Sequence, residues 1–366
     1  MKSLIVLIIG FGFISSKTAL EGSSALPITK DFFSIFDGKP GSLFIICLPY
    51  IIVLFAEYFF RHKSDSILKR SVKPKTFTQQ IIFNKKSRRD GWYFLFSFTN
   101  VPLLLLAIYT IGSHSLIQKL SPKASAFLQT IITRENLTND IFIILLLIVG
   151  ITISELSSYI RHHCLHNNNI LWKSHEFHHC AESMNVLNIT RNANSDNIPN
   201  LLVLPISLLG VTITSTALLA GSTSAVTIYI FYMIIHNINN YLGHSSLYYK
   251  HPFPLNKIFM SPYHHWVHHS SDQAHHGKNL NTTFLLWDKV FGTYKDISST
   301  EALNLKFGVK STSYNKYNPF IEFYVLPYFL VYKEILNGIV KLSKNKSHIN
   351  VVKTEPRTIR SITTKI

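Results

Sequence analysis

Cysteine and acidic residues are scarce in this chain. Its 366 residues include three cysteines, too few for a disulfide framework. Asp and Glu number 19 against 36 Lys and Arg, which gives a formal net charge of +17. No basic groove interleaved with aromatic residues and no nucleic-acid-binding signature accompanies that excess. We therefore predict no nucleic-acid partner.

Charged residues of both signs make up only 15% of the chain, whereas hydrophobic residues make up 47% and lie in long blocks. This composition favours a polytopic membrane protein over a soluble globular one. Spans of about 20 residues cross a bilayer core of roughly 30 Å. We predict such spans at 42–60, 92–112, 140–159, 199–220 and 222–239.

Lys and Arg are concentrated between the apolar blocks. Residues 61–90 carry ten of them against two Asp, and the positive-inside rule places this segment in the cytoplasm. Counting spans from there, the ends of 140–159 and 222–239 fall on the same cytoplasmic side. We therefore predict an integral, multi-pass protein of a bacterial inner membrane or the endoplasmic reticulum.

Four segments organise the chain. They are 1–41, a signal-like or first membrane segment with an external loop; 42–139, membrane spans with the basic loop; 140–310, a histidine-rich region; and 311–366, a C-terminal interfacial helix with a basic tail. The apolar run in 1–15 fits either a signal peptide or a membrane helix. Residues 318–340 contain Glu322 and Lys333, which favours an interfacial or packed helix, and the polar tail is expected to begin at Lys341.

Residues 161–185 are the most informative stretch of the chain. They contain an HxxxH pair and an HxxHH triplet, formed by His162, His166, His175, His178 and His179. Residues at i, i+3 and i+4 project from one face of a helix, so each set is expected to converge. Imidazoles suit iron, zinc, copper or nickel far better than calcium or magnesium. Cys164 and Cys180 lie among them, and we interpret these as bystander thiols.

A second HxxHH triplet, His265, His268 and His269, repeats this spacing. Two triplets and a pair are too many ligands for one tetrahedral zinc, whereas eight or nine imidazoles match a two-metal centre. The expected fold is thus all-α, a polytopic membrane helical bundle with a cytoplasmic histidine-rich di-metal cap. One alternative remains, because residues 175–179 also spell HExxH, the zinc-metalloprotease motif with Glu176 as general base. That interpretation leaves the second triplet without a role.

These residues, in this order, resemble the fatty acid hydroxylase and sterol desaturase superfamily of membrane-bound histidine-box di-iron oxygenases. The first boxes are matched by Glu155, Tyr159, His162, His166, Leu171, Trp172, His175, His178 and His179. The later elements are matched by His244, Pro262, His265, His268, His269, Asn279, Trp287, Asp288, Phe291, Gly292 and Thr293. Departures from the pattern are Glu155 for Asp, His163 for Arg, Ser246 for Asn and Asn281 for Gly. The resemblance covers 140–310 and implies that this segment is the catalytic domain.

The resemblance implies two iron ions held by nine histidines. These are His162, His166, His175, His178, His179, His244, His265, His268 and His269. Glu155, Asn279 and Asp288 are the catalytic candidates outside this set. His236, His276 and Asp272 are candidates either for additional ligands or for hydrogen-bond partners of the ligands.

The same resemblance implies an enzyme, an oxidoreductase that uses O2 to hydroxylate or desaturate an unactivated C–H bond of a lipid of the sterol or fatty acyl type. It further implies an electron donor such as a cytochrome b5 or ferredoxin with an NAD(P)H reductase, which basic cytoplasmic loops are suited to attract. The alternatives are an intramembrane HExxH zinc metalloprotease and a non-catalytic membrane metal-binding protein. The latter predicts ionisable residues in the middle of the spans, and the spans are nearly free of them.

Overall fold

The structure is a computed structural model that describes residues 88–98, 122–123, 126–128, 130, 132–133 and 135–354. Within these residues the regular structure is helical, and the β-type contacts are two isolated bridges, Phe259–Phe284 and Ser270–Phe307. The all-helical prediction is therefore confirmed over this part of the chain. The spans predicted at 42–60 and, beyond Phe98, at 92–112 lie outside the described residues, as does the apolar run in 1–15.

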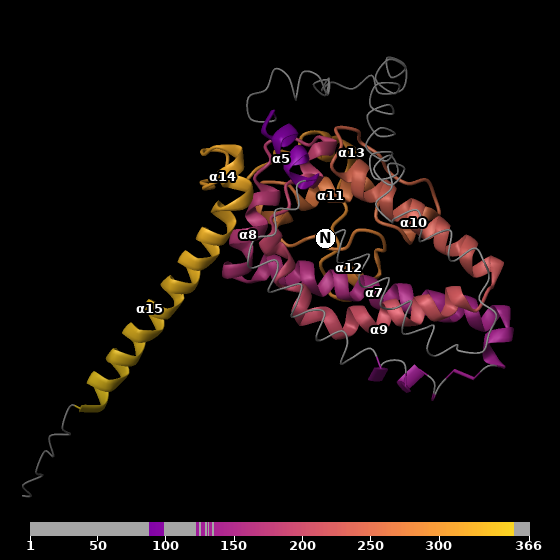
Figure 1. The fold of residues 1–366 in the computed structure, drawn as a ribbon. Helices are drawn as coiled ribbons and strands as arrows, with labels where there is room; N and C mark the ends of the chain where they lie inside the picture. The colour runs from indigo at the N-terminus through magenta and orange to yellow at the C-terminus, as the bar shows by residue number, and fades with distance from the viewer. Residues whose placement is uncertain are drawn as a thin grey trace, which may run out of the picture.

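The longer helices of the described residues form the frame (Figure 1). They are α5 (Arg88–Phe98), α7 (Asp140–Asn167), α8 (Asn169–His179), α9 (Asn200–Leu219), α10 (Thr223–Gly243) and α15 (Leu326–Thr354). Short helices occupy the connections: α11 (Pro262–His268), α12 (Leu286–Val290), α13 (Ser299–Leu303), α14 (Pro319–Tyr324) and the 3-10 turns η1 (Asn136–Thr138), η2 (Val186–Thr190), η3 (Asn194–Asn197), η4 (Leu255–Lys257) and η5 (Gln273–His275).

Helix α7 carries the first histidines beyond an apolar span. Asn139 caps its start by accepting the N–H of Phe142. The negative charge of Asp140 in the first turn interacts favourably with the positive end of the helix dipole. Its 28 residues extend for about 42 Å, longer than a hydrocarbon core of roughly 30 Å. The last two turns, with His162 and His166, are thus long enough to extend past the apolar segment. At Asn168 the backbone becomes extended, and its side chain caps α8.

Helix α9 packs along most of α7, and the two helices lie side by side in Figure 1. Two glycines permit this close approach. A Cβ on Gly150 would lie 2.5 Å from Thr214 Oγ1, and a Cβ on Gly210 would lie 2.5 Å from Ser154 Oγ. Small residues at the contact are typical of helix pairs in membranes. Among the described helices, α7 and α9 are the two that are long and apolar enough to cross a membrane.

Helix α10 follows α9 after a tight turn at Gly221, as the predicted hairpin requires. The two helices nevertheless diverge, because α9 packs on α7 along its length and touches α10 at few points. Helix α10 contains His236 and several Tyr and Asn residues, which makes it less apolar than α7 and α9. Its C-terminal end delivers His244 to the same end of the bundle as α8 and α11.

Segments on either side of the histidine-rich region pack against it. Tyr93 of α5 is buried with Phe177 of α8, Tyr314 and Phe323, so both flanking segments share one aromatic core. Helix α15 packs against α8 and then extends away from the body (Figure 1). It continues to Thr354, within the basic, polar tail that the sequence places from Lys341 onwards, and the next Gly or Pro in the sequence is Pro356.

Candidate metal centre

Nine buried or half-buried histidines form two groups whose ligand atoms lie within 4.8 Å of one another in each group. The five-histidine cluster contains His162, His166, His175, His179 and His268. The four-histidine cluster contains His178, His244, His265 and His269. These are the nine residues that the sequence singles out. The clusters adjoin, because the rings of His179 and His269 stack with their centroids 4.3 Å apart.

Each HxxHH triplet divides between the two clusters, which the sequence does not predict. His175 and His179 of α8 join one cluster, and His178 joins the other. The triplet of α11 divides in the opposite sense, and His268 crosses to the five-histidine cluster. Residues i and i+4 lie about 40° apart around a helix, whereas i+3 lies about 60° to the other side. One triplet can therefore contribute ligands to two adjacent sites. Because both triplets do so, each site receives histidines from both triplets.

The nitrogen spacing fits a shared ion in each cluster. His175 Nε2 lies 3.1 Å from His162 Nε2 and 3.2 Å from His179 Nε2. In the other cluster, the Nε2 atoms of His244 and His265 lie 3.0 Å apart. Two ligands about 2.1 Å from one ion lie roughly 3.0 Å apart at a right angle and about 3.4 Å apart at the tetrahedral angle.

Several ring nitrogens in these clusters have no hydrogen-bond partner within the described part of the chain. The buried Nε2 atoms of His166 and His268 are of this kind, whereas His269 faces the cluster with Nε2 and its unpaired atom is Nδ1. An unpaired buried nitrogen costs free energy unless it has a ligand. The donor set and its unpaired atoms therefore fit transition-metal ions.

In several of these histidines, the ring nitrogen that faces away from the cluster makes a hydrogen bond that fixes the tautomer. Nδ1 of His162, His178 and His268 lies 2.6, 3.1 and 2.9 Å from the carbonyl oxygens of Leu280, Arg191 and Lys278. A carbonyl oxygen only accepts, so each Nδ1 donates and each Nε2 presents its lone pair to the cluster.

His175 uses a carboxylate instead of a carbonyl, with Nδ1 3.0 Å from Asp196 Oδ2. Asp196 also accepts from the hydroxyl of Ser174. Asp196 is not among the candidate residues named from the sequence. The available signal is that Asp196 is the one acidic residue in 186–200.

Burial keeps these imidazoles neutral, which is the form that binds metal. It lowers the pKa of His244 and of His268 to about 4. Burial and the neighbouring imidazoles also lower the pKa of the remaining cluster histidines on α8 and α11 well below the usual value.

Asn279 and Asp288 hold the backbone that supports the five-histidine cluster. The Asp288 carboxylate is fully buried and accepts the N–H groups of Leu280 and Asn281 at 2.8 and 2.9 Å. Asn279 has a left-handed backbone, φ 52°, and its side chain bonds to the backbone of His264 and Lys295. Asp288 therefore bonds to backbone groups of the loop that presents the Leu280 and Lys278 carbonyls, and Asn279 anchors the same loop to the backbone of His264 and Lys295. Neither residue belongs to a histidine cluster.

Glu155 lies outside both clusters, in a polar network between α7 and α10. Its Oε1 accepts from the hydroxyls of Tyr232 at 2.6 Å and Thr283 at 2.8 Å. His236 lies at the edge of this network, with Nδ1 2.7 Å from Thr283 Oγ1 and 3.8 Å from Glu155 Oε1. His236 is thus a partner of the Glu155 network and does not join either cluster.

The remaining candidates also lie apart from the clusters. The exposed Asp272 caps η5 by accepting the N–H of Ala274, and the side chain of His276 is exposed. Cys180 is buried and lies 3.0 Å from an Arg191 nitrogen, and burial raises its pKa to about 12. Glu176 is buried on α8 with its carboxylate 3.4 Å from Lys173 Nζ. A metalloprotease base would instead face the metal beside His175 and His179.

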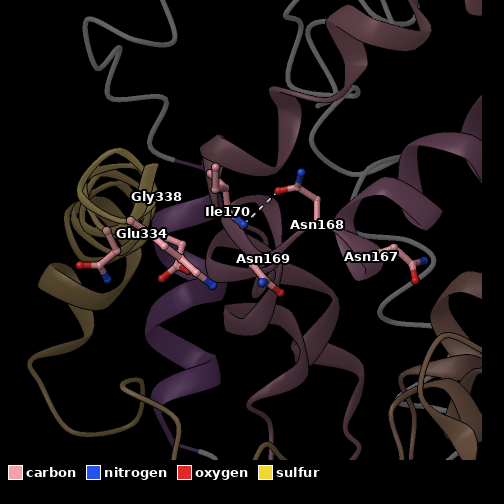
Figure 2. Close-up of a pocket in the computed structure, with 8 residues that line it drawn as sticks. Asn167, Asn168, Asn169, Ile170, Glu334 and Gly338 are labelled. Carbon is pink, nitrogen blue, oxygen red and sulfur yellow. Dashed lines mark hydrogen bonds between the residues drawn. The ribbon is translucent and has the colours of Figure 1, made fainter. Parts of the chain in front are cut away.

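Two surface pockets lie near the bundle. The larger, about 470 Å³, is a polar hollow where α7 meets α8 and α15; Figure 2 shows Asn167, Asn168, Asn169 and Ile170 on one side and Glu334 and Gly338 on the other. None of the nine histidines lines it. The second, about 320 Å³, is apolar and lies between α7 and α10, lined by Ile148, Ile151, Thr152, Ile228, Phe231, Tyr232, Phe259 and Phe284. Tyr232 joins this apolar pocket to the Glu155 network.

Comparison with known proteins agrees with this site. Residues 147–293, which include all nine histidines, match the fatty acid hydroxylase family. Ornithine lipid hydroxylase OlsE of Rhizobium tropici is 28% identical over 149 residues, 40% of this chain and 41% of that protein. Alkylglycerol monooxygenase of Homo sapiens is 31% identical over 140 residues, 37% of this chain and 27% of that protein. The matches span less than half of either relative, and no solved structure matches the chain. Residues 147–293 therefore match the fatty acid hydroxylase family, and in this region the chain is a distant homologue of these two lipid-modifying enzymes.

Proposed function

We propose that this protein is a membrane-bound di-iron oxygenase that hydroxylates or desaturates an unactivated C–H bond in the hydrocarbon chain of a lipid. The observation that carries the proposal is the pair of adjoining histidine clusters at one end of the apolar helix α7. Five and four neutral imidazoles are sufficient for one iron each, with coordination positions left for an oxygen ligand. The family implies an oxidoreductase, and this donor set is consistent with it.

Bound iron would supply the activation of O2, with one oxygen atom entering the C–H bond or two hydrogens being removed, and with electrons from a partner protein. The histidines of this chain hold the metal, and the carbonyls of Leu280, Lys278 and Arg191 keep their rings aligned. Asn279 and Asp288 act through the loop rather than at the reacting atoms. We assign them positioning roles.

The apolar pocket between α7 and α10 supports a hydrocarbon substrate. It lies at the level of Thr152 and Ile228, ten and sixteen residues before His162 and His244 on the same two helices. At ~1.5 Å per residue these intervals are about 15 Å and 24 Å, so a chain occupying the pocket would extend along both helices towards the clusters. The named substrates of the two relatives, an ornithine lipid and an alkylglycerol, carry such chains beside a polar group. We place an acyl or alkyl chain in this pocket.

An acidic one-electron donor of the cytochrome b5 or ferredoxin type, with an NAD(P)H reductase, is the redox partner we propose. The formal net charge of +17 supports attraction of an acidic protein. The proposed membrane is a bacterial inner membrane or the endoplasmic reticulum, with the histidines on its cytoplasmic side.

Metal analysis of the detergent-purified protein tests this function. We expect two irons per chain in the unmodified protein. His178→Ala should lose iron from the four-histidine cluster and His268→Ala from the five-histidine cluster, and either change should abolish turnover. His163→Ala is the matched control, because this exposed neighbour of His162 belongs to neither cluster. A single zinc retained in the His178→Ala/His268→Ala double variant would contradict the proposal.

The reaction itself is tested by mass spectrometry of lipid extracts from cells with and without the gene. We expect a lipid class that gains one oxygen or loses two hydrogens only when the unmodified gene is present. Loss of activity in Glu176→Gln with full activity in His268→Ala would instead indicate a metalloprotease, since that mechanism requires the glutamate and not the second triplet.

A further inference from the structure

A buried ion pair links α5 to the turn that follows the α8 histidines. Arg191 is 2% exposed and Asp90 is 1% exposed, and Arg191 Nε lies 2.5 Å from Asp90 Oδ1. Arg191 also donates to Asn315 Oδ1 at 3.0 Å and lies over the ring of Tyr93. Burial alone would lower the pKa of Arg191, but the facing Asp90 carboxylate, together with Cys180 and Tyr93, raises it. The pair is thus a fully enclosed salt bridge.

Asp90 holds both ends of one short segment. Its Oδ1 accepts from Arg191, and its Oδ2 accepts from the side-chain N–H of Asn185 at 2.8 Å. Between these two residues the chain forms the 3-10 turn η2, which Asn185 caps by accepting the N–H of Leu187. A single carboxylate therefore fixes the start and the end of η2 relative to α5.

The segment that Asp90 fixes carries one of the groups that orient the metal ligands. The carbonyl oxygen of Arg191 accepts from Nδ1 of His178 at 3.1 Å. His178 is the residue that α8 contributes to the four-histidine cluster. The Arg191 carbonyl that orients His178 is thus positioned by a salt bridge. His244 of the same cluster instead bonds to the carbonyl of Asn240 in α10.

We propose that Asp90 is a positioning residue for the four-histidine metal site and acts on His178 through Arg191. The inference rests on the proposed metal-binding function. Asp90 lies outside 147–293, the part of the chain that matches the fatty acid hydroxylase family, so α5 contributes a necessary part of the metal site from beyond the matched region. Loss of the Asp90 carboxylate frees the Arg191 carbonyl to move and thereby relaxes the alignment of His178.

The test uses the full-length enzyme loaded with ⁵⁷Fe and compared by Mössbauer spectroscopy. Asp90→Asn is expected to change the signal of one iron, leave that of the other, and lower the affinity for one iron by roughly tenfold. Arg89→Gln is the matched control. It removes a neighbouring ion pair of the same helix, in which Arg89 Nη1 lies 2.8 Å from Glu322 Oε2. Neither side chain of this pair bonds to a carbonyl that accepts from a cluster histidine. Both iron signals should stay unchanged in this control.

Arg191→Lys tests the same link if Asp90→Asn fails to fold. It keeps a cation opposite Asp90 but loses the planar set of donors that also reaches Asn315. The same selective change in one iron signal is expected. Two unchanged signals in a folded Asp90→Asn or Arg191→Lys variant would overturn the inference, as would equal changes at both irons in Asp90→Asn and Arg89→Gln. An unmodified protein that binds no second iron would overturn the proposed function, and this inference with it.

Discussion

Removal of the Asp288 carboxylate should release the loop that supports the five-histidine cluster. The carboxylate has no exposed surface and accepts two backbone N–H groups, those of Leu280 and Asn281, together with the hydroxyl of Thr293 at 2.6 Å. Asp288→Ala leaves both N–H groups buried without an acceptor. Each such orphan costs about 1–3 kcal/mol, so the expected loss in unfolding free energy is about 2–6 kcal/mol.

The loss should be accompanied by a selective metal defect. Leu280, one of the residues held by Asp288, presents the carbonyl that accepts from His162, and the nearby Lys278 carbonyl accepts from His268. Both histidines belong to the five-histidine cluster. Iron in that cluster should therefore become easier to remove, by roughly tenfold to a hundredfold, while iron in the four-histidine cluster is retained.

Two assays measure these effects in detergent-purified protein: denaturant unfolding for stability, and iron retention against increasing chelator for affinity. Asp288→Asn keeps one acceptor oxygen and should lose about half as much stability. The control is Asp272→Asn, because that exposed carboxylate caps η5 in the adjoining loop, and its stability should change by less than about 0.5 kcal/mol. An Asp288→Ala protein that holds both irons as tightly as the unmodified protein would refute the reasoning.

Three further predictions follow from packing, pocket and burial. Gly150→Val should cost about 3 kcal/mol in a thermal or denaturant melt, because its Cβ would lie 2.6 Å from the backbone nitrogen of Thr214; unaltered stability would show that the α7–α9 contact is looser than described. Ile228→Trp should narrow the apolar pocket and raise KM for long-chain lipids more than for short-chain ones, and an equal effect on all chain lengths would contradict a chain-binding role. Metal-stripped protein should lose stability as pH falls from about 6.5 to 4, by about 3 kcal/mol for each of His244 and His268, because the unfolded chain binds protons that the folded state, with pKa about 4, does not. A urea midpoint that rises as the pH falls from about 6.5 to 4 would contradict these lowered pKa values.

The sequence by itself determined the candidate metal ligands and the family resemblance of this protein. Histidine spacing at i, i+3 and i+4 is local information, so it identifies eight of the nine imidazoles without any knowledge of the fold, and the family resemblance adds His244. Apolar runs likewise determine the helices α7, α9 and α10, because burial of a helix in lipid or protein demands a continuous apolar stretch. The order of the boxes was specific enough to indicate the family, which the match over 147–293 confirms.

Only the tertiary structure decided how these parts combine. A triplet on one helix faces two directions, so its division between clusters depends on how α8 and α11 approach each other, and helix spacing alone carries no such information. The roles of Asp288 and Asp196 depend on hydrogen bonds that join segments distant in the sequence. The link from Asp90 to His178 spans 88 residues and passes through Arg191, because a buried charge must be paired with whichever segment the fold brings beside it.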